Sequence, residues 1–202
     1  MKNAKRLVAD GNQKNVIGLF QSLCGKHSRW NVWADFITMA AISISNAVDQ
    51  SHFVEREETY RTIQSKYSQS EMQVFADMLC EVVLGMEQNP DQDFLGELFM
   101  RLELGNDHRG QFFTPYTVCR LMAEMQYDVN ERIENDGWIS VGDPACGAGA
   151  LLVAFANVCT RKNINFQTSV LFVAQDMGKA SPFALRLPLS VLRKGIGRAI
   201  PW

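Results

Sequence analysis

The sequence has few of the residues that hold metals or form cross-links. Its five cysteines occur singly, without any Cys-x-x-Cys pair, and only one of its three histidines, His27, lies within a few residues of a cysteine. Structural zinc sites and disulfide-bonded domains both need closely spaced ligands or a denser set of cysteines. The pattern therefore argues against a metal site and a disulfide framework, and it favours reduced thiols buried in the interior.

Long apolar runs are also missing. The uncharged apolar stretch at residues 36–48 contains Thr, Ser and Asn, and it is too short to cross a bilayer. The basic start, residues 1–6, is not followed by an apolar segment. We therefore expect no signal peptide, no association with a membrane and a cytoplasmic protein.

The chain carries little excess charge. Its formal net charge is −2, whereas domains that bind DNA by themselves usually have a basic balance. This weakens the case for a stand-alone DNA-binding domain, but it leaves open a basic face or a partner that supplies one. Apolar residues make up 47% of the 202 residues, enough for a sizeable core in one medium or two small domains.

The apolar spacing of the first half predicts a helical domain over residues 1–105. We expect helices at 29–49, 70–88 and 94–104. Ser68 and Glu71 fit a capping box before the second of these, Asn89-Pro90 ends it, and Gly105 ends the third. One stripe of that second helix is predicted to pack in the core, with a partner surface as the alternative; it contains Met72, Phe75, Leu79, Val82, Val83 and Met86.

The pattern changes after Gly105. Residues 117–126 read as a helix, with Thr114 as N-cap, Pro115 at the first helical position and one apolar face that contains Val118, Leu121, Met122 and Met125. A strand at 138–141 that turns at Gly142, a helix at 150–159 and a strand at 171–174 then follow. This order predicts a right-handed βαβ unit in a parallel sheet, so we assign an α/β fold class with a second domain over 106–202.

The turn between the first strand and its helix reads Asp143-Pro-Ala-Cys-Gly-Ala-Gly149. A glycine-rich turn lets a ligand approach the backbone, and the helix N-terminus that follows it favours an anion. The turn lacks both the dinucleotide fingerprint and the P-loop pattern. Asp143 suits a positive group instead. A cofactor with an ammonium and a carboxylate, such as S-adenosylmethionine, would use both features. The alternative is an ordinary strand-to-helix turn that binds no ligand.

Two further segments are weak signals by themselves. Gly110-Gln-Phe-Phe-Thr-Pro115 places two aromatic residues before a helix, which is also what a hydrophobic staple would do. Asp176 follows the second strand, where an acidic side chain can bind ribose hydroxyls, but this is also a common strand ending.

In this order and spacing, the three segments resemble the modification subunits of type I restriction-modification systems and related N6-adenine DNA methylases. The resemblance runs from Phe94 to Asp176, and the helical domain fits the family by class and position. It implies that 106–202 begins a Rossmann-like S-adenosylmethionine-dependent methyltransferase sheet in a site-specific adenine-N6 DNA methyltransferase. It also implies DNA as substrate, and it allows specificity and restriction subunits, or self-association, as partners.

The resemblance also implies roles for individual residues. Phe113 and Thr114 would contact the methionine end of the cofactor, and Asp176 would bind its ribose. The turn would hold the cofactor through four residues: Asp143, Cys146, Gly147 and Gly149.

The chain departs from the family where the adenine should bind. The family's catalytic Asn-Pro-Pro-Tyr or Asn-Pro-Pro-Phe segment is absent, and Asn89-Pro90 lies upstream and is followed by Asp91. We therefore assign no catalytic residue, and we expect a catalytically incomplete chain with at most weak cofactor binding. Our hypothesis is that it arose by truncation or frameshift of a longer methylase gene.

The tail at 177–202 is atypical, because Pro182 and Pro188 interrupt any long helix and no acidic residue follows Asp176. Basic residues gather in and before it, and they either bind DNA or a partner or form a solvated charge run. They are Arg161, Lys162, Lys179, Arg186, Arg193, Lys194 and Arg198. Two alternatives for the whole chain stay open: a non-enzymatic helical interaction or DNA-binding module with a vestigial cofactor loop, and a methylase that acts on RNA or protein.

Overall fold

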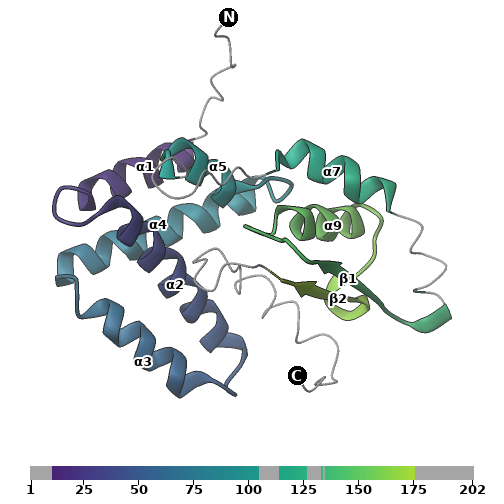
Figure 1. The fold of residues 1–202 in the computed structure, drawn as a ribbon, viewed down its shortest axis with the longest axis horizontal. Coiled ribbons are helices and arrows are strands. Elements are labelled where there is room, and N and C mark those ends of the chain that lie inside the picture. Colours follow the sequence, from purple (N-terminus) through teal and green to yellow (C-terminus); the bar gives the residue numbers. More distant parts are fainter. Residues whose placement is uncertain (1–10, 105–113, 127–132, 134, 176–202) are drawn as a thin grey trace, which may run out of the picture.

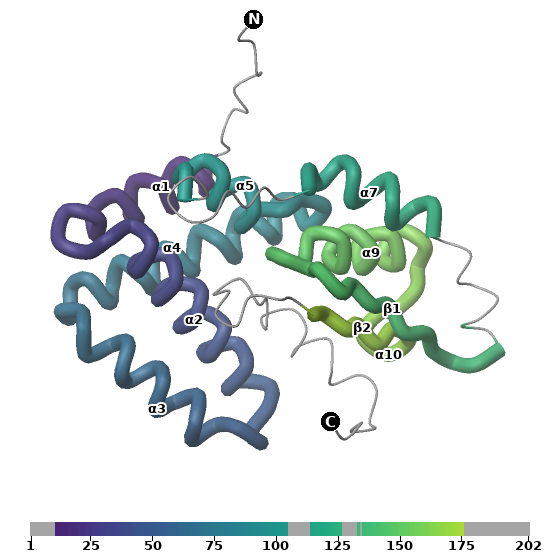
Figure 2. Tube along the Cα trace, in the orientation of Figure 1, coloured from purple at the N-terminus to yellow at the C-terminus, as the bar shows by residue number. Residues whose placement is uncertain are grey.

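The computed structural model of the chain describes residues 11–104, 114–126, 133 and 135–175, in a helical part and an α/β part (Figure 1). The helical part contains α1 (Gly11–Leu23), α2 (Arg29–Val48), α3 (Phe53–Gln64), α4 (Gln69–Gln88) and α5 (Phe94–Arg101). The α/β part contains α7 (Tyr116–Met125), β1 (Ile139–Asp143), α9 (Ala150–Arg161), α10 (Phe166–Ser169) and β2 (Val170–Ala174). Figure 2 traces this order along the chain. No helix in the described ranges is long and apolar enough to span a membrane.

Aromatic rings fill the core of the helical part. Trp33 is 1% exposed, and its ring centroid lies 6.0 Å from that of Phe99 and 6.2 Å from that of Phe36. Phe36 in turn stacks on Phe75 with a centroid distance of 6.3 Å. These contacts join α2, α4 and α5 around one cluster, so the helices that precede the α/β part form a core of their own.

The predicted starts of α2 and α4 are confirmed. The Ser28 hydroxyl accepts a hydrogen bond from the Asn31 amide at 3.2 Å. At α4, the Ser68 hydroxyl accepts from the Glu71 amide, and the Glu71 carboxylate accepts from the Ser68 amide at 2.8 Å. This reciprocal pair is the capping box that the sequence predicts, and α4 ends at Asn89, also as predicted.

The predicted core stripe of α4 is partly wrong. Val83 and Met86 are 45% and 43% exposed, whereas Met78, which the prediction left out, is fully buried with Phe75 and Val82. Steps of three, four and three residues lead from Phe75 to Gly85, so these positions stay on one line of the helix while Val83 falls beside it. Gly85 completes the line, because a Cβ there would clash with the ring of Phe94 at the start of α5.

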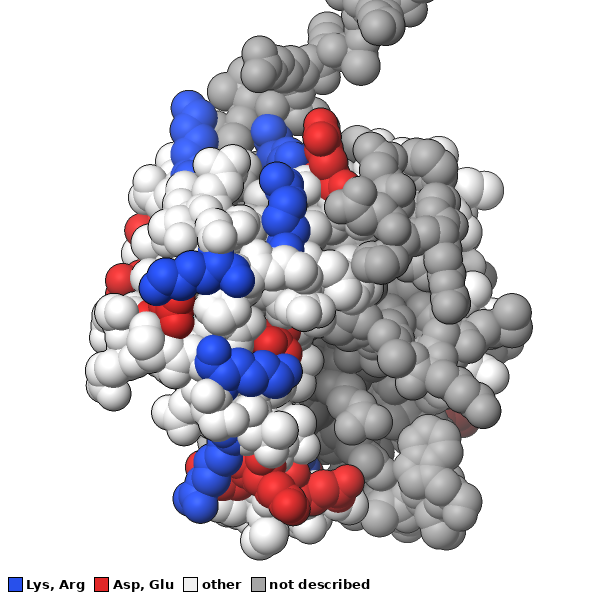
Figure 3. Space-filling model, turned by 60° about the vertical axis from the view of Figure 1, so that its left-hand side comes forward, with Lys and Arg blue, Asp and Glu red and all other residues white. Residues whose placement is uncertain are grey.

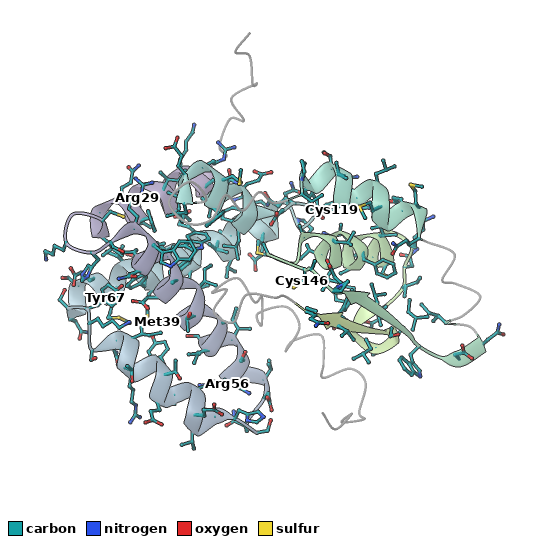
Figure 4. All side chains as sticks on the ribbon, in the orientation of Figure 1. Arg29, Met39, Arg56, Tyr67, Cys119 and Cys146 are labelled. Atoms are coloured by element: carbon teal, nitrogen blue, oxygen red, sulfur yellow. The ribbon has the colours of Figure 1, made fainter. Side chains whose placement is uncertain are left out.

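A carboxylate is buried beside this core. Asp35 is 8% exposed, and it accepts hydrogen bonds from the Tyr67 hydroxyl at 2.9 Å and from Lys66 Nζ at 3.2 Å. Burial, and then the bond to Asp35, raise the pKa of Tyr67. The His27 ring lies 4.5 Å from the Tyr67 ring (Tyr67 is labelled in Figure 4). The network ties the chain before α4 to α2 and leaves the buried charge fully paired.

The predicted strand–helix–strand order is confirmed in the α/β part. β1 and β2 pair in parallel, in a register from Ile139↔Val170 to Asp143↔Ala174, and α9 packs beside them. The described residues thus form a two-stranded parallel sheet of an α/β protein. Gly142 does not turn the chain as predicted, because it lies within β1 and pairs with Val173.

Helix α7 differs from its prediction in two ways. Its N-cap is Pro115, without a side-chain cap, rather than Thr114. Its contacts with α9 are made by a different side from the predicted apolar face, through buried Cys119 and Ala123, whose small side chains let the two helices approach closely. The predicted face is exposed by between 41% and 78%, at Val118, Leu121, Met122 and Met125.

Charges of both signs mix on the surface. On the face in Figure 3, blue Lys and Arg side chains of the described part alternate with red Asp and Glu side chains. Arg161, which the sequence grouped with the basic tail, is paired with Asp91 at 2.8 Å and with Glu124 at 2.6 Å. Its charge is therefore used within the protein, while residues 177–202 lie outside the described residues.

The capping box predicts a pH-dependent contribution to stability. The Ser68 amide and hydroxyl lower the pKa of Glu71 from 4.5 to about 2. A carboxyl group with a lowered folded-state pKa stabilises the protein above its unfolded-state pKa, and this contribution is lost as the pH falls toward 2. Glu71→Gln should therefore unfold at lower urea concentration than wild type at neutral pH, and the difference should close between about pH 4.5 and pH 2.

Glu87→Gln is the matched control for urea unfolding followed by circular dichroism. Glu87 is exposed at the other end of α4, and its variant should match wild type at each pH. Equal unfolding midpoints of wild type and Glu71→Gln at neutral pH would show that the charge of Glu71 adds nothing to stability.

Candidate functional site

The loop from Asp143 to Gly149 lies at the end of the sheet that faces the helical part. β1 and β2 both run toward that part, and α7 and α9 both begin there (Figure 1). The Cys146 amide donates to the Gln175 carbonyl at 3.0 Å, and the Gln175 amide donates to the Asp143 carbonyl at 2.9 Å. These backbone bonds fix the loop against the end of β2.

Asp143 shapes the first turn of this loop. One carboxylate oxygen, Oδ1, accepts a hydrogen bond from the Ala145 amide at 3.0 Å. The side chain is half-buried, so it stands at the sheet end without being enclosed by the core. A carboxylate in this position can receive a positively charged group of a ligand.

Both predicted glycines have backbone conformations that suit glycine. Gly149 has φ 82° and ψ 14°, and Gly147 has φ 48°, in the left-handed region. The Gly149 amide donates to the Cys146 carbonyl at 2.7 Å, which closes the turn directly before α9. Gly149 is also the N-cap of α9, without a side-chain cap, so the first amides of that helix point toward the same end of the sheet.

Cys146 points inward rather than toward solvent. It is 9% exposed, and its Sγ–H lies 3.8 Å from the Gly147 carbonyl. Cys146 is labelled in Figure 4, as is Cys119 on the first turn of α7. Among the predicted buried thiols, Cys119, Cys146 and Cys159 are buried, whereas Cys24 is half-buried and Cys80 is exposed.

The start of α7 lies next to the loop. Thr114 is exposed, and its carbonyl accepts from the Cys119 thiol at 3.8 Å. Burial raises the pKa of Cys119, and the negative charges of Asp93 and Asp143 raise it further. Two carboxylates thus act on this thiol, one at the start of α5 and one at the start of the loop. Phe113 and Asp176 lie outside the described residues.

Two members of this site carry no clear sequence signal. Asp93 caps α5 by accepting from the Gly96 amide at 3.0 Å, and burial raises its pKa. Gln175 acts through its backbone, which any residue could supply. The combined arrangement offers a half-buried carboxylate and a helix N-terminus without a side-chain cap, so it can receive a small ligand that carries both charges. Among the described residues, no group of His, Cys, Asp and Glu side chains is placed to hold a metal ion.

Comparison with known proteins gives two matches. Residues 95–185 match the family model described as N-6 DNA Methylase. A stretch of 119 residues, 56% of this chain, is 32% identical to the type II restriction enzyme and methyltransferase RM.BcgI of Heyndrickxia coagulans. The match covers 18% of that protein's length. No solved structure matches significantly.

The left-handed glycine of the loop predicts a specific cost of substitution. Gly149→Ala should destabilise the α/β part by about 1–2 kcal/mol, because a Cβ disfavours this conformation. Gly142→Ala is the control, since a Cβ there meets open space and its φ lies outside the left-handed region. Urea unfolding of both variants measures the effect. Equal unfolding midpoints of the two variants would show that alanine adopts the backbone conformation of Gly149 without cost.

Proposed function

We propose that this chain provides the S-adenosylmethionine-binding part of a site-specific adenine-N6 DNA methyltransferase of restriction-modification type, because residues 95–185 match the N-6 DNA Methylase family model. The observation that carries the proposal is the loop after β1. Its carboxylate, its two left-handed glycines and the N-terminus of α9 stand together at the carboxyl end of two parallel strands. That end is where ligands bind in open α/β sheets.

The charges of this loop suit the methionine head group of the cofactor. Asp143 would pair with the ammonium group, and the first amides of α9 would face the carboxylate. Gly147 and Gly149 would let the cofactor approach the backbone, since neither has a Cβ in the way. Cys146 would contribute through its backbone and its buried packing.

The two neighbouring segments would complete the cofactor site. Phe113 and Thr114 would contact the methionine end. Thr114 is exposed, and its carbonyl accepts a hydrogen bond from the Cys119 thiol in the first turn of α7, which supports this assignment. Asp176 would bind the ribose hydroxyls, because it follows Gln175, whose backbone bonds the loop. When bound, S-adenosylmethionine supplies an activated methyl group. These residues bind and orient it, and positioning is a large part of catalysis by such enzymes.

DNA is the substrate that this proposal implies. Handling of a flipped adenine requires groups that hold its exocyclic amine and stack on its ring. The 202 residues contain no Asn-Pro-Pro-aromatic segment for this task. In our proposal these residues therefore bind the cofactor weakly and do not methylate DNA by themselves. Specificity and restriction subunits, or a second copy, are the proposed partners in the cytoplasm.

One observation favours a second function, a helical interaction module. The apolar face of α7 is exposed at four positions at helical spacing, from Val118 to Met125. Such a face is typical of a surface that binds another helix or chain. Light scattering with and without cofactor separates the two functions. An interaction module should form a stable oligomer whose molar mass does not change when S-adenosylmethionine is added.

Calorimetry with S-adenosylmethionine tests the cofactor site directly. Wild type should bind with a dissociation constant in the micromolar range or weaker. Asp143→Asn should weaken binding about tenfold or more, because it keeps an oxygen for the Ala145 amide but loses the charge that pairs with the ammonium group. Asp136→Asn, at an exposed position before β1, is the control and should bind as wild type does.

Three results of this titration would change the proposal. Sub-micromolar binding by wild type would contradict a partial site. Equal affinity of wild type and Asp143→Asn would remove Asp143 from it. A complete lack of heat with wild type would favour the interaction module.

Methyl transfer gives an independent test. The 202-residue chain, incubated with DNA and radiolabelled S-adenosylmethionine, should transfer no label to adenine above background, since it lacks the segment that holds the base. Label in N6-methyladenine after digestion of the DNA would overturn the incomplete-enzyme proposal. A complete methylase of this family is the positive control.

A further inference from the structure

A polar cluster joins the turn between α4 and α5 to both α7 and α9. Asp91, in that turn, accepts a hydrogen bond from the Tyr116 hydroxyl at 2.9 Å through Oδ1. Its other oxygen, Oδ2, accepts from Arg161 Nη1 at 2.8 Å, and Arg120 Nη2 lies 3.4 Å away. One carboxylate thus contacts the first residue of α7 and the last residue of α9.

Asn157 of α9 closes the cluster from the other side. Its Nδ2 donates to the Tyr116 hydroxyl and to the Pro90 carbonyl, each at 2.9 Å. The Tyr116 hydroxyl therefore donates to Asp91 and accepts from Asn157. Burial, and the Asp91 bond and charge, raise the pKa of Tyr116 to about 12, against the opposing effect of Asn157. The hydroxyl stays protonated, and so remains a donor, over the whole working pH range.

The contacts of this cluster differ in how much they stabilise it. The pairs of Arg161 and Arg120 with Asp91 are partly exposed, with Arg side chains 34% and 46% accessible, so solvent and salt screen them. The Tyr116 side chain is half-buried and donates to a charged acceptor, which makes its bond less screened and stronger. We therefore expect that loss of the hydrogen bond between Tyr116 and Asp91 weakens the cluster most.

Tyr116 stands two residues after Thr114 and is where α7 begins. The Thr114 carbonyl accepts a hydrogen bond from the Cys119 thiol, one turn into the same helix, and α7 begins at the same end of the sheet as the loop that contains Asp143 (Figure 1). A shift of the first turn of α7 would thus move Thr114 away from the loop that contains Asp143.

From this geometry we infer that Asp91 and Tyr116 are positioning residues, which hold the segment around Thr114 against the loop and so set the affinity for S-adenosylmethionine. The inference rests on the proposed function for its ligand. It makes the helical part a support of the cofactor site, because Asp91 belongs to the turn between α4 and α5. Neither residue touches the cofactor in this proposal, so both act through the placement of α7.

Hydrogen exchange of the ligand-free 202-residue protein tests the positioning itself. Tyr116→Phe and Asp91→Asn should each raise the exchange rates of the amides at 116–119 severalfold, while the amides of α2 and α4 keep their rates. Tyr60→Phe is the matched control, since it removes a hydroxyl from a half-buried tyrosine of the helical core. Unchanged exchange at 116–119 in both variants would overturn the inference, whatever the protein binds.

Calorimetry of the same variants tests the consequence for the ligand. Each single variant should raise the dissociation constant for S-adenosylmethionine about tenfold, and the double variant should be no weaker than the singles, because both remove one interaction. A role in overall stability alone predicts wild-type affinity of the folded single variants instead. Wild-type affinity in both singles, or additive losses, would overturn the inference.

The two proposals fail in different ways. If wild type binds no cofactor, the proposed function fails and exchange alone decides whether Asp91 and Tyr116 hold α7. If wild type binds and Asp143→Asn does not, but the Tyr116 and Asp91 variants bind normally, the proposed function stands and the positioning inference is wrong.

Discussion

Parallel pairing of β1 with β2 is the constraint on which the candidate site depends. Two parallel neighbours need a crossover between them, and α9 supplies it. The loop that leaves β1 must then lie beside the end of β2. The backbone bonds between Cys146, Gln175 and Asp143 are the direct expression of this arrangement.

The turn into α9 explains why the loop needs its glycines. The chain must leave a strand, close on itself and start a helix within a few residues. Gly147 and Gly149 do so with positive φ, and the amide of Gly149 donates back to the Cys146 carbonyl. This leaves the start of α9 without a side-chain cap, at the place where an anion is best stabilised. The two glycines therefore make the turn possible, and they also leave the start of α9 without a side-chain cap, where an anion can bind.

The helical part contributes more than a neighbouring core. The turn between α4 and α5 brings Asp91 to Tyr116 and Arg161, and Asp93 to the vicinity of Cys119. The relative position of α7 and α9 is therefore fixed from both sides, by the close packing of Cys119 and Ala123 and by the polar cluster.

Sequence by itself determined the elements whose signals are local. The capping box at Ser68 and Glu71, the stop at Asn89, the strand–helix–strand order and the glycine turn all depend on residues near one another in the chain. The family resemblance from Phe94 to Asp176 could be recognised for the same reason, because it consists of short motifs in a fixed order. The N-6 DNA Methylase match over 95–185 agrees with it. Tertiary structure decided which faces are buried. The exposed face of α7 from Val118 to Met125 is the more apolar one, yet Cys119 and Ala123 pack on α9 because small side chains allow two helices to approach closely. It also decided that Asp91 meets Tyr116 across 25 residues of sequence, a pairing that no periodicity encodes.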